Sequence, residues 1–147
     1  MRERPSKEET FVAMVKEVAK RSTCLRPREI DGQVGAILVK EGRVISTGYA
    51  GSPRGMPHCL DEGCLMDGDA CVRTIHAEAN AIAFAAKSGT STDGTTMYCT
   101  LAPCLSCAKL IINSGVKEVI FLNDYRITDG IELLIVAGVR VRKYELH

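Results

Sequence analysis

The sequence predicts a layered α/β domain in which helices alternate with strands and some strands run parallel. Three successive units each place a helix before a strand, at 76–88 with 95–100, 104–114 with 118–122, and 128–137 with 139–144. Gly89, Gly115 and Gly138 stand where these helices would end, a position that favours a left-handed glycine. Such alternation is typical of strands joined by crossover helices. The length of 147 residues suits one domain, so we expect residues 1–147 to form a single one.

The amino-terminal part predicts an amphipathic helix followed by a β-hairpin. Residues 6–21 place apolar side chains on one helical stripe, and Ser6 and Glu9 have the spacing of a capping box. Two β-rich runs follow, at 34–39 and 43–49, and the Glu-Gly pair between them suits a tight turn. We therefore expect these two strands to be antiparallel neighbours.

The segment from Gly51 to Thr74 predicts a long loop, because no period of 2 or 3.6 residues survives its Gly, Pro, Asp and Cys content. Structureless loops of more than about 15 residues are uncommon in compact domains unless they are functional or disordered. Four Cys and His side chains within the segment favour a functional loop.

Composition limits the classes of function that the chain could have. Its 19 basic and 18 acidic residues leave a net charge of +1, which argues against a strongly basic nucleic-acid-binding protein. The amino terminus is charged, and no apolar run approaches the ~20 residues that a membrane span needs. We expect a soluble, cytoplasmic protein. In a reducing compartment, seven cysteines favour metal ligation or catalysis over a disulfide framework.

A histidine and two cysteines make up the ligand set of a catalytic zinc site. Zinc in such a site takes three protein ligands and leaves the fourth position to water. Cys104 and Cys107 are spaced i and i+3, so one helical turn presents both sulfurs on the same side. Pro103 suits the start of that helix. With His76, these cysteines predict a zinc centre.

Glu78 is the candidate proton carrier of this centre. On an ideal helix His76 and Glu78 diverge by about 200°, so they can share a site only near a helix end. If the helix begins at Thr74 or Ile75, the carboxylate comes alongside the bound water. Zinc lowers the pKa of that water to about 7. Glu78 would then carry its proton to a ring nitrogen of an amino-heterocycle and later to the departing ammonia.

The order H-x-E followed by P-C-x-x-C is the signature of zinc deaminases. Each part alone has a simpler interpretation, since a lone histidine near an alanine-rich helix is usually packed or exposed, and a lone C-x-x-C is often redox-active or structural. The interval between Glu78 and Pro103 accommodates the rest of one helix and one strand, which favours a common site. A zinc-binding assembly module is the non-enzymatic alternative, although a structural site needs no acid beside its metal.

Motifs along nearly the whole chain support a family resemblance: "STCLR", "GYAGSPRG", "CVRTIHAEANAI" and "TMYCTLAPCLSCAKLIINSGVKEVIF". On these motifs the chain resembles the deoxycytidylate (dCMP) deaminase family of the cytidine deaminase-like superfamily. The resemblance implies a three-layer α/β/α fold with a five-stranded mixed sheet and conversion of dCMP to dUMP and ammonia. It also implies a homo-oligomer, a hexamer by family analogy, with dCTP and dTTP as possible allosteric effectors.

The resemblance assigns the zinc centre by position. His76, Cys104 and Cys107 would bind the metal, and Glu78 would be the proton shuttle. Asn80 would contact the sugar of the nucleotide.

The glycine-rich turn "GYAGSPRG" would lie beside the nucleotide. Gly48 and Gly51 permit close backbone approach there, while Arg54 could meet a phosphate. Tyr125 resembles a family tyrosine near that phosphate, but a solvated Arg54 and a rim or core Tyr125 are equally good interpretations. The family usually has Gly-Tyr-Asn-Gly in this turn, whereas this chain has Ala50. The loss of that amide leaves open another cytosine nucleotide, nucleoside or base, or tRNA adenosine, although the near-zero net charge argues against tRNA.

Four of the other cysteines flank or occupy the long loop: Cys24, Cys59, Cys64 and Cys71. Four sulfurs make a closed structural zinc site, which could replace the core that this loop lacks. Some members of the family that the chain resembles carry a second zinc here, and His58 is the substitute ligand if one cysteine turns away. Buried free thiols are the alternative. Cys99 is expected to be a small buried residue of a strand.

Overall fold

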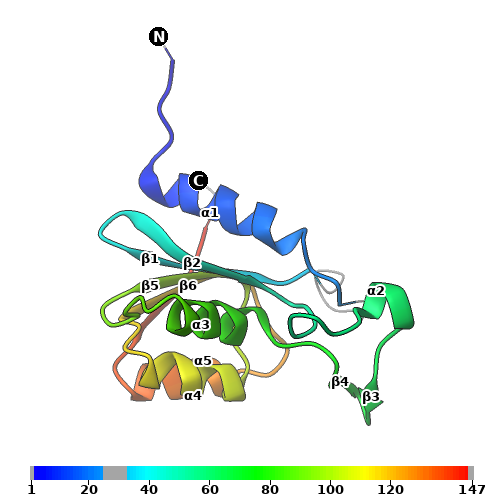
Figure 1. Cartoon of the computed structure of the whole chain (residues 1–147). Helices are drawn as coiled ribbons and strands as arrows, with labels where there is room; N and C mark the ends of the chain where they lie inside the picture. Colours follow the sequence, from blue (N-terminus) through cyan, green and yellow to red (C-terminus); the bar gives the residue numbers. More distant parts are fainter. Residues whose placement is uncertain (1, 25–32, 146–147) are drawn as a thin grey trace.

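A five-stranded sheet lies between two layers of helices in the computed structural model, which describes residues 2–24 and 33–145 (Figure 1). Its strands, in the order β2-β1-β5-β6-β7, are β2 (Arg43–Tyr49), β1 (Gly35–Lys40), β5 (Thr96–Leu101), β6 (Glu118–Asn123) and β7 (Arg140–Lys143). β1 pairs antiparallel with β2 and β5, whereas β5, β6 and β7 run parallel. The mixed α/β/α architecture and the antiparallel hairpin are confirmed; that the whole chain is one domain stays a prediction.

One helix covers the first face of the sheet and three cover the second (Figure 1). They are α1 (Lys7–Ala19) on the first face, and α3 (Ala77–Lys87), α4 (Leu105–Asn113) and α5 (Asp129–Val136) on the second. The predicted capping box is present at α1, since Ser6 Oγ accepts from the Glu9 amide at 3.0 Å and Glu9 Oε2 accepts from the Ser6 amide at 2.8 Å. The three glycines predicted to end α3, α4 and α5 all have positive φ.

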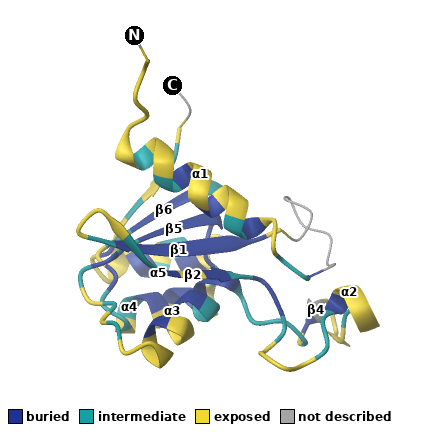
Figure 2. Ribbon diagram, turned by 45° about the horizontal axis from the view of Figure 1, so that its top comes forward, coloured by how far each residue is buried: buried dark blue, intermediate teal, exposed yellow. Residues whose placement is uncertain are grey.

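Each face of the sheet contributes to its own apolar core. Along β1, Ala36 and Leu38 pack in the cluster on the α3 side, while Ile37 and Val39 pack in the cluster on the α1 side. Figure 2 shows the sheet buried between helices whose outer surfaces are exposed. A strand that is buried on both faces reads as a continuous apolar run, which explains the sequence Ala36–Val39 in β1.

The segment between β2 and α3 contains short regular elements, so the prediction of a structureless loop is wrong. It holds α2 (Cys59–Glu62) and the antiparallel pair β3 (Met66–Asp67) and β4 (Ala70–Cys71), and it projects from the sandwich (Figure 1). Elements of two to four residues leave no hydrophobic period in the sequence. An antiparallel bridge closes the base of the segment, with Gly51 and Ile75 exchanging hydrogen bonds of 3.3 and 2.8 Å.

No helix among the described residues is long and apolar enough to cross a membrane.

Candidate metal centre

The three side chains that the sequence nominates as zinc ligands lie together. His76 Nδ1 is 3.4 Å from Cys104 Sγ and 3.4 Å from Cys107 Sγ, and the three ligand atoms are within 4.8 Å of one another. A tetrahedral zinc with bonds of about 2.3 Å to sulfur and about 2.0 Å to nitrogen separates these two donors by about 3.5 Å. The donor atoms and their spacing therefore fit zinc.

Two helix N-termini converge to build this arrangement. His76 is the N-cap residue of α3 and Cys104 is the N-cap residue of α4, with Cys107 in the first turn of α4. Amide hydrogens and the positive end of the dipole are at these termini, where thiolates are stabilised. As the sequence predicts from the i, i+3 spacing of Cys104 and Cys107, one helical turn brings both sulfurs next to Nδ1 of His76.

The start of α3 differs from the expected one. The helix begins at Ala77, not at Thr74 or Ile75, because His76 is extended with φ −63° and ψ 148°. The 200° divergence of an ideal helix consequently does not apply to His76 and Glu78. An extended ligand residue before the first turn leaves Glu78 free to approach the same centre, where its carboxyl contacts Cys107.

Glu78 has the environment of a proton carrier. It is only 3% exposed, and this burial raises the pKa of its carboxyl, although the charge of His76 and the hydrogen bond with Cys107 act in the opposite direction. Burial disfavours the charged carboxylate, so the group holds a proton at higher pH than an exposed glutamate.

The two thiols of the centre titrate as a pair. The hydrogen bond with Cys107 lowers the pKa of Cys104 to about 4, against the effect of burial. The hydrogen bond with Cys104 and burial raise the pKa of Cys107. One proton is thus shared between two sulfurs that a metal ion would deprotonate outright.

The glycine-rich turn is fastened to the start of α3. Asn80 Nδ2 donates to the carbonyl oxygen of Tyr49 at 3.1 Å, and Gly51 is bridged to the residue before His76. Ala50, between these two anchors, is 2% exposed. The structure therefore ties the turn after β2 to the first turns of α3 through Asn80 and to the residue before His76 through Gly51.

The other two substrate residues named from the sequence differ in exposure. Arg54 is exposed on the turn. Tyr125 is half-buried and packs against the core on the α3 side of the sheet.

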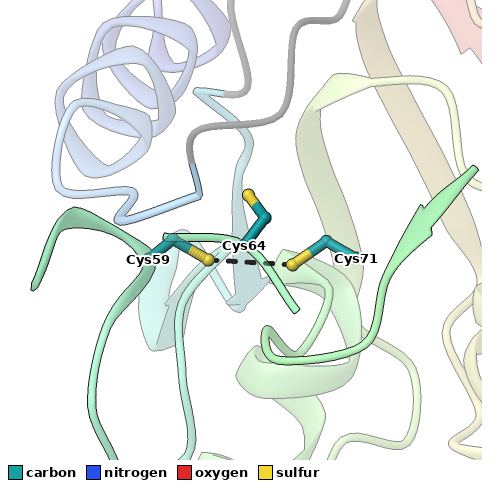
Figure 3. A group of neighbouring side chains, drawn as sticks. All are labelled: Cys59, Cys64 and Cys71. Atoms are coloured by element: carbon teal, nitrogen blue, oxygen red, sulfur yellow. Dashed lines mark hydrogen bonds between the residues drawn. The ribbon is translucent and has the colours of Figure 1, made fainter. Parts of the chain in front are cut away.

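A second group of possible ligands lies in the segment between β2 and α3. The sulfurs of Cys59, Cys64 and Cys71 are within 4.8 Å of one another, and those of Cys59 and Cys71 are 3.7 Å apart (Figure 3). Tetrahedral zinc holds two sulfurs about 3.8 Å apart. These three cysteines therefore also fit zinc.

The remaining members of the predicted second site are placed differently. Cys24 is buried, but its sulfur is not part of the group of three. His58 Nδ1 lies 3.1 Å from Thr23 Oγ1, next in the chain to Cys24. The start of α2 and the residues that follow α1 thus meet at this point.

Comparison with known proteins identifies the family of this site. The chain matches the family model for the cytidine and deoxycytidylate deaminase zinc-binding region over residues 5–123. It belongs to the cytidine and deoxycytidylate deaminase family. Members of this family are hydrolases of C–N bonds that carry a zinc-binding region.

Individual relatives cover most of this deaminase. ComE operon protein 2 of Bacillus subtilis is 46% identical over 145 residues, covering 98% of this chain and 74% of the relative. Deoxycytidylate deaminase of Saccharomyces cerevisiae is 36% identical over 149 residues, covering 96% of this chain but 46% of the relative. This deaminase thus spans less than half the length of the yeast protein.

A solved structure has the same fold. The dCMP deaminase of cyanophage S-TIM5, in complex with dCMP and dUMP, superimposes with a TM-score of 0.83 at 36% identity. The match covers 97% of this deaminase and 100% of the cyanophage chain.

Sequence reasoning placed Gly48 of this deaminase beside a nucleotide, whereas the structure places it against α3. A Cβ at Gly48 would lie 2.5 Å from the amide nitrogen of Ala81 and closer still to the carbonyl oxygen of Ala77. Ser46 Oγ donates to the carbonyl of Ala81 at 2.6 Å. The alternation of small residues at 46 and 48 is the signal for this close contact between β2 and α3.

Proposed function

We propose that this protein is a zinc-dependent deaminase that converts dCMP to dUMP and ammonia. The observation that carries the proposal is a His-Cys-Cys trio at zinc spacing with the buried carboxyl of Glu78 in contact with one of its sulfurs. The cyanophage relative that binds dCMP and dUMP supports the choice of substrate.

In the proposed reaction His76, Cys104 and Cys107 would hold the zinc. The metal, when bound, supplies an activated water at neutral pH. Glu78 would accept a proton from the attacking water and deliver it to N3 of the pyrimidine ring, while the remaining hydroxyl adds to C4. Glu78 would then move the proton of the added hydroxyl to the amino group, so that the C4–N bond breaks, ammonia leaves and C4 becomes a carbonyl carbon. Burial suits Glu78 to this exchange because it raises the pKa of the carboxyl.

We propose that the turn after β2 recognises the rest of the nucleotide. Asn80 would contact the sugar, and its bond to the Tyr49 carbonyl supports this role because it holds the amide against the end of β2. Gly51, which pairs with Ile75, would present its backbone to the nucleotide. The side chain of Arg54 is exposed and would bind a 5′-phosphate. Tyr125 would lie near the same phosphate.

Ammonia release from a panel of substrates tests the proposed function. The panel contains dCMP, deoxycytidine, cytidine, cytosine and an RNA hairpin with a target adenosine. We expect dCMP to have the highest kcat/KM. If only compounds without a 5′-phosphate are deaminated, dCMP is not the substrate. If the zinc-loaded protein deaminates none of the compounds, the non-enzymatic zinc-binding assembly module is favoured.

We further propose a second, structural zinc held by Cys59, Cys64 and Cys71, with Cys24 as fourth ligand and His58 as its substitute. The spacing of the three sulfurs supports it, and so does the poor apolar core of this segment, in which Leu60, Leu65 and Met66 are at least half exposed. Exposed apolar side chains leave the segment little burial to stabilise it.

Zinc content tests the second site. We expect two zinc ions per wild-type chain and one in Cys59→Ala, with two retained in the control Cys99→Ala, whose sulfur is buried in β5. Loss of the second ion in Cys24→Ala, and not in His58→Ala, would assign the fourth ligand. One zinc per wild-type chain would contradict the proposal.

We also propose that the enzyme is a cytoplasmic homo-oligomer, a hexamer by analogy with the family, with dCTP and dTTP as effectors. Apolar side chains exposed on α3, α4 and α5 support self-association, namely Phe84, Leu110, Ile135 and Val136. Light scattering should give a mass several times that of one chain, and Val136→Asp should reduce it. A monomer in both proteins would contradict the proposal.

A further inference from the structure

The turn after β2 carries a hydroxyl that the deamination chemistry does not use. Ser52 Oγ is shielded from solvent, and it has no hydrogen-bond partner within the part of the chain that the structure describes. Folded proteins pair nearly all of their buried polar groups, because an unpaired one costs free energy of folding. An unpaired buried hydroxyl next to an active site indicates a group whose hydrogen-bond partner is an atom of the ligand.

The strand that leads to Ser52 shows which face this hydroxyl occupies. Side chains of a strand alternate between its two faces. Ser46 Oγ bonds the Ala81 carbonyl, and a Cβ at Gly48 would press on the same helix, so this face of β2 lies against α3. If the chain stays extended after β2, the side chains at positions 50 and 52 lie on this same α3-facing side. They then lie beyond the N-terminal end of α3.

The backbone contacts support this extended course. Ala50 donates to the Val34 carbonyl at 3.0 Å, while Gly51 bonds Ile75 on the opposite side, as alternating residues of a strand do. A Cβ at Gly51 would meet the ring of Tyr49 at 3.0 Å, so position 51 belongs to the other face. Position 52 therefore belongs to the α3 face.

The bridge also sets the distance of Ser52 from the metal ligands. Because Gly51 pairs antiparallel with Ile75, Ala50 lies opposite His76 and Ser52 lies opposite Thr74. Ser52 is thus two residues, roughly 7 Å along the chain, beyond the residue that faces His76. Ala50 offers only a methyl group there, so Ser52 is the next side chain on this face that can form a hydrogen bond.

We propose that the Ser52 hydroxyl is a specificity-determining group that bonds an oxygen of the deoxyribose 5′-phosphate part of the substrate. The proposal rests on the proposed function, which places the pyrimidine ring at the metal and the sugar and phosphate away from it. A serine hydroxyl can donate to a phosphate or sugar oxygen and accept from the 3′-hydroxyl. The distance from His76 suits this part of the ligand, not the reacting ring.

Kinetics of Ser52→Ala test the proposal with three substrates: dCMP, deoxycytidine, and 2′,3′-dideoxycytidine 5′-monophosphate. With dCMP we expect KM to rise about three- to tenfold, the value of one hydrogen bond, while kcat changes less than about twofold. The increase should disappear with the substrate that lacks the bonded oxygen, which identifies that oxygen. Ser52→Thr should restore the wild-type KM.

The exposed Ser88 provides a matched control, since Ser88→Ala removes a hydroxyl far along α3 and should change neither constant. An unchanged KM in Ser52→Ala would overturn the proposal and leave the hydroxyl to a water molecule. An increase of equal size with all three substrates would also overturn it, because it would report a general disturbance of the turn.

Thermal unfolding separates this proposal from the proposed function. Without ligand, Ser52→Ala should unfold at a temperature no lower than wild type, since the hydroxyl makes no hydrogen bond with the described residues that the variant would lose. Saturating dUMP should raise the unfolding temperature less in Ser52→Ala than in wild type. An equal rise in both proteins would contradict the role of Ser52, whereas a wild type that binds dUMP without deaminating dCMP would contradict only the proposed reaction.

Discussion

Cys71 shows how single residues prepare a metal site. Burial raises the pKa of this thiol, but hydrogen bonds with the Arg73 and Leu65 backbone, together with those from the neighbouring thiols, outweigh burial and lower the pKa to about 7. Burial and the hydrogen bonds with Cys64 and Cys71 instead raise the pKa of Cys59 to about 12. One sulfur is thus a ready ligand at neutral pH, and its neighbour gives up a proton only to a metal.

Metal binding at this cluster should therefore depend on pH. Protons and metal compete for the same sulfurs, so affinity rises with pH, and it rises about tenfold per pH unit for each proton released. Because Cys59 keeps its proton up to a pKa of about 12, at least one proton leaves at pH 6.5 to 8.5. Titration with Co²⁺, followed by its thiolate absorption, measures this dependence.

The variant Cys59→Ala is the control for that titration, since it removes the thiol whose proton is displaced. Co²⁺ binding in Cys59→Ala should be weaker and should depend less on pH. An affinity of the wild-type cluster that is the same at pH 6.5 and 8.5 would rule out the proposed exchange of proton for metal.

The ligands of the first site could be named from the sequence because their chemistry and order are distinctive. His76, Cys104 and Cys107 are brought together as the sequence predicts. The helix start at Ala77 could not be predicted, because no residue type marks an extended histidine as an N-cap. Which three of the four cysteines form the compact group depends on tertiary packing, which spacing does not reveal.

At the scale of elements, the contact between β2 and α3 positions the catalytic machinery. Gly48 allows the backbone of α3 to approach the strand, and Asn80 ties the first turns of that helix to Tyr49. α3 carries Glu78 and begins directly after His76. Its distance from the sheet therefore controls where both residues stand.

Gly48→Ala should disturb this contact. The added methyl group has no room between β2 and α3, so we expect a loss of about 1 to 3 kcal/mol in unfolding free energy and a lower kcat. Urea unfolding and dCMP kinetics on the same preparation measure both effects.

Gly89→Ala, at the other end of α3, is the control for Gly48→Ala, because it should lower the unfolding free energy by a similar amount. Position 89 has φ 69° and open space around a Cβ, so alanine there costs about 1 kcal/mol through backbone strain alone. Its kcat should stay at the wild-type value. Equal losses of kcat in the two variants would show that stability, not the position of α3, sets the rate.

Elements with a clear period were predictable, and the shorter ones were not. The helices and the five strands of the sheet follow from apolar spacing and from glycines at the helix ends. α2, β3 and β4 have two to four residues each, and their cysteines come together without a repeating apolar pattern. Local pattern therefore predicts the sandwich but not the small segment attached to it.

At the scale of the whole molecule, the parallel half of the sheet places two helix N-termini at one edge. α3 leads into β5, and α4 leads from β5 to β6, which runs parallel to β5. The N-terminus of α4 thus follows the carboxyl end of β5, where α/β folds commonly bind ligands. The fold supplies the place, and the side chains of His76, Glu78, Cys104 and Cys107 supply the chemistry.

The proposed mechanism depends on Glu78 as a proton carrier that is not a metal ligand. Replacement by glutamine keeps the size and the burial of the side chain but removes its ability to exchange a proton. The exposed Glu132 on α5 provides the control variant Glu132→Gln, which should behave as wild type.

The most direct test is dUMP formation from dCMP by Glu78→Gln, measured together with the zinc content of the same preparation. The mechanism predicts that kcat falls at least about 100-fold, as expected for the loss of a general acid and base, while zinc content stays at the wild-type value. A variant that retains kcat within about tenfold of wild type, or that loses its zinc, would contradict the role assigned to Glu78.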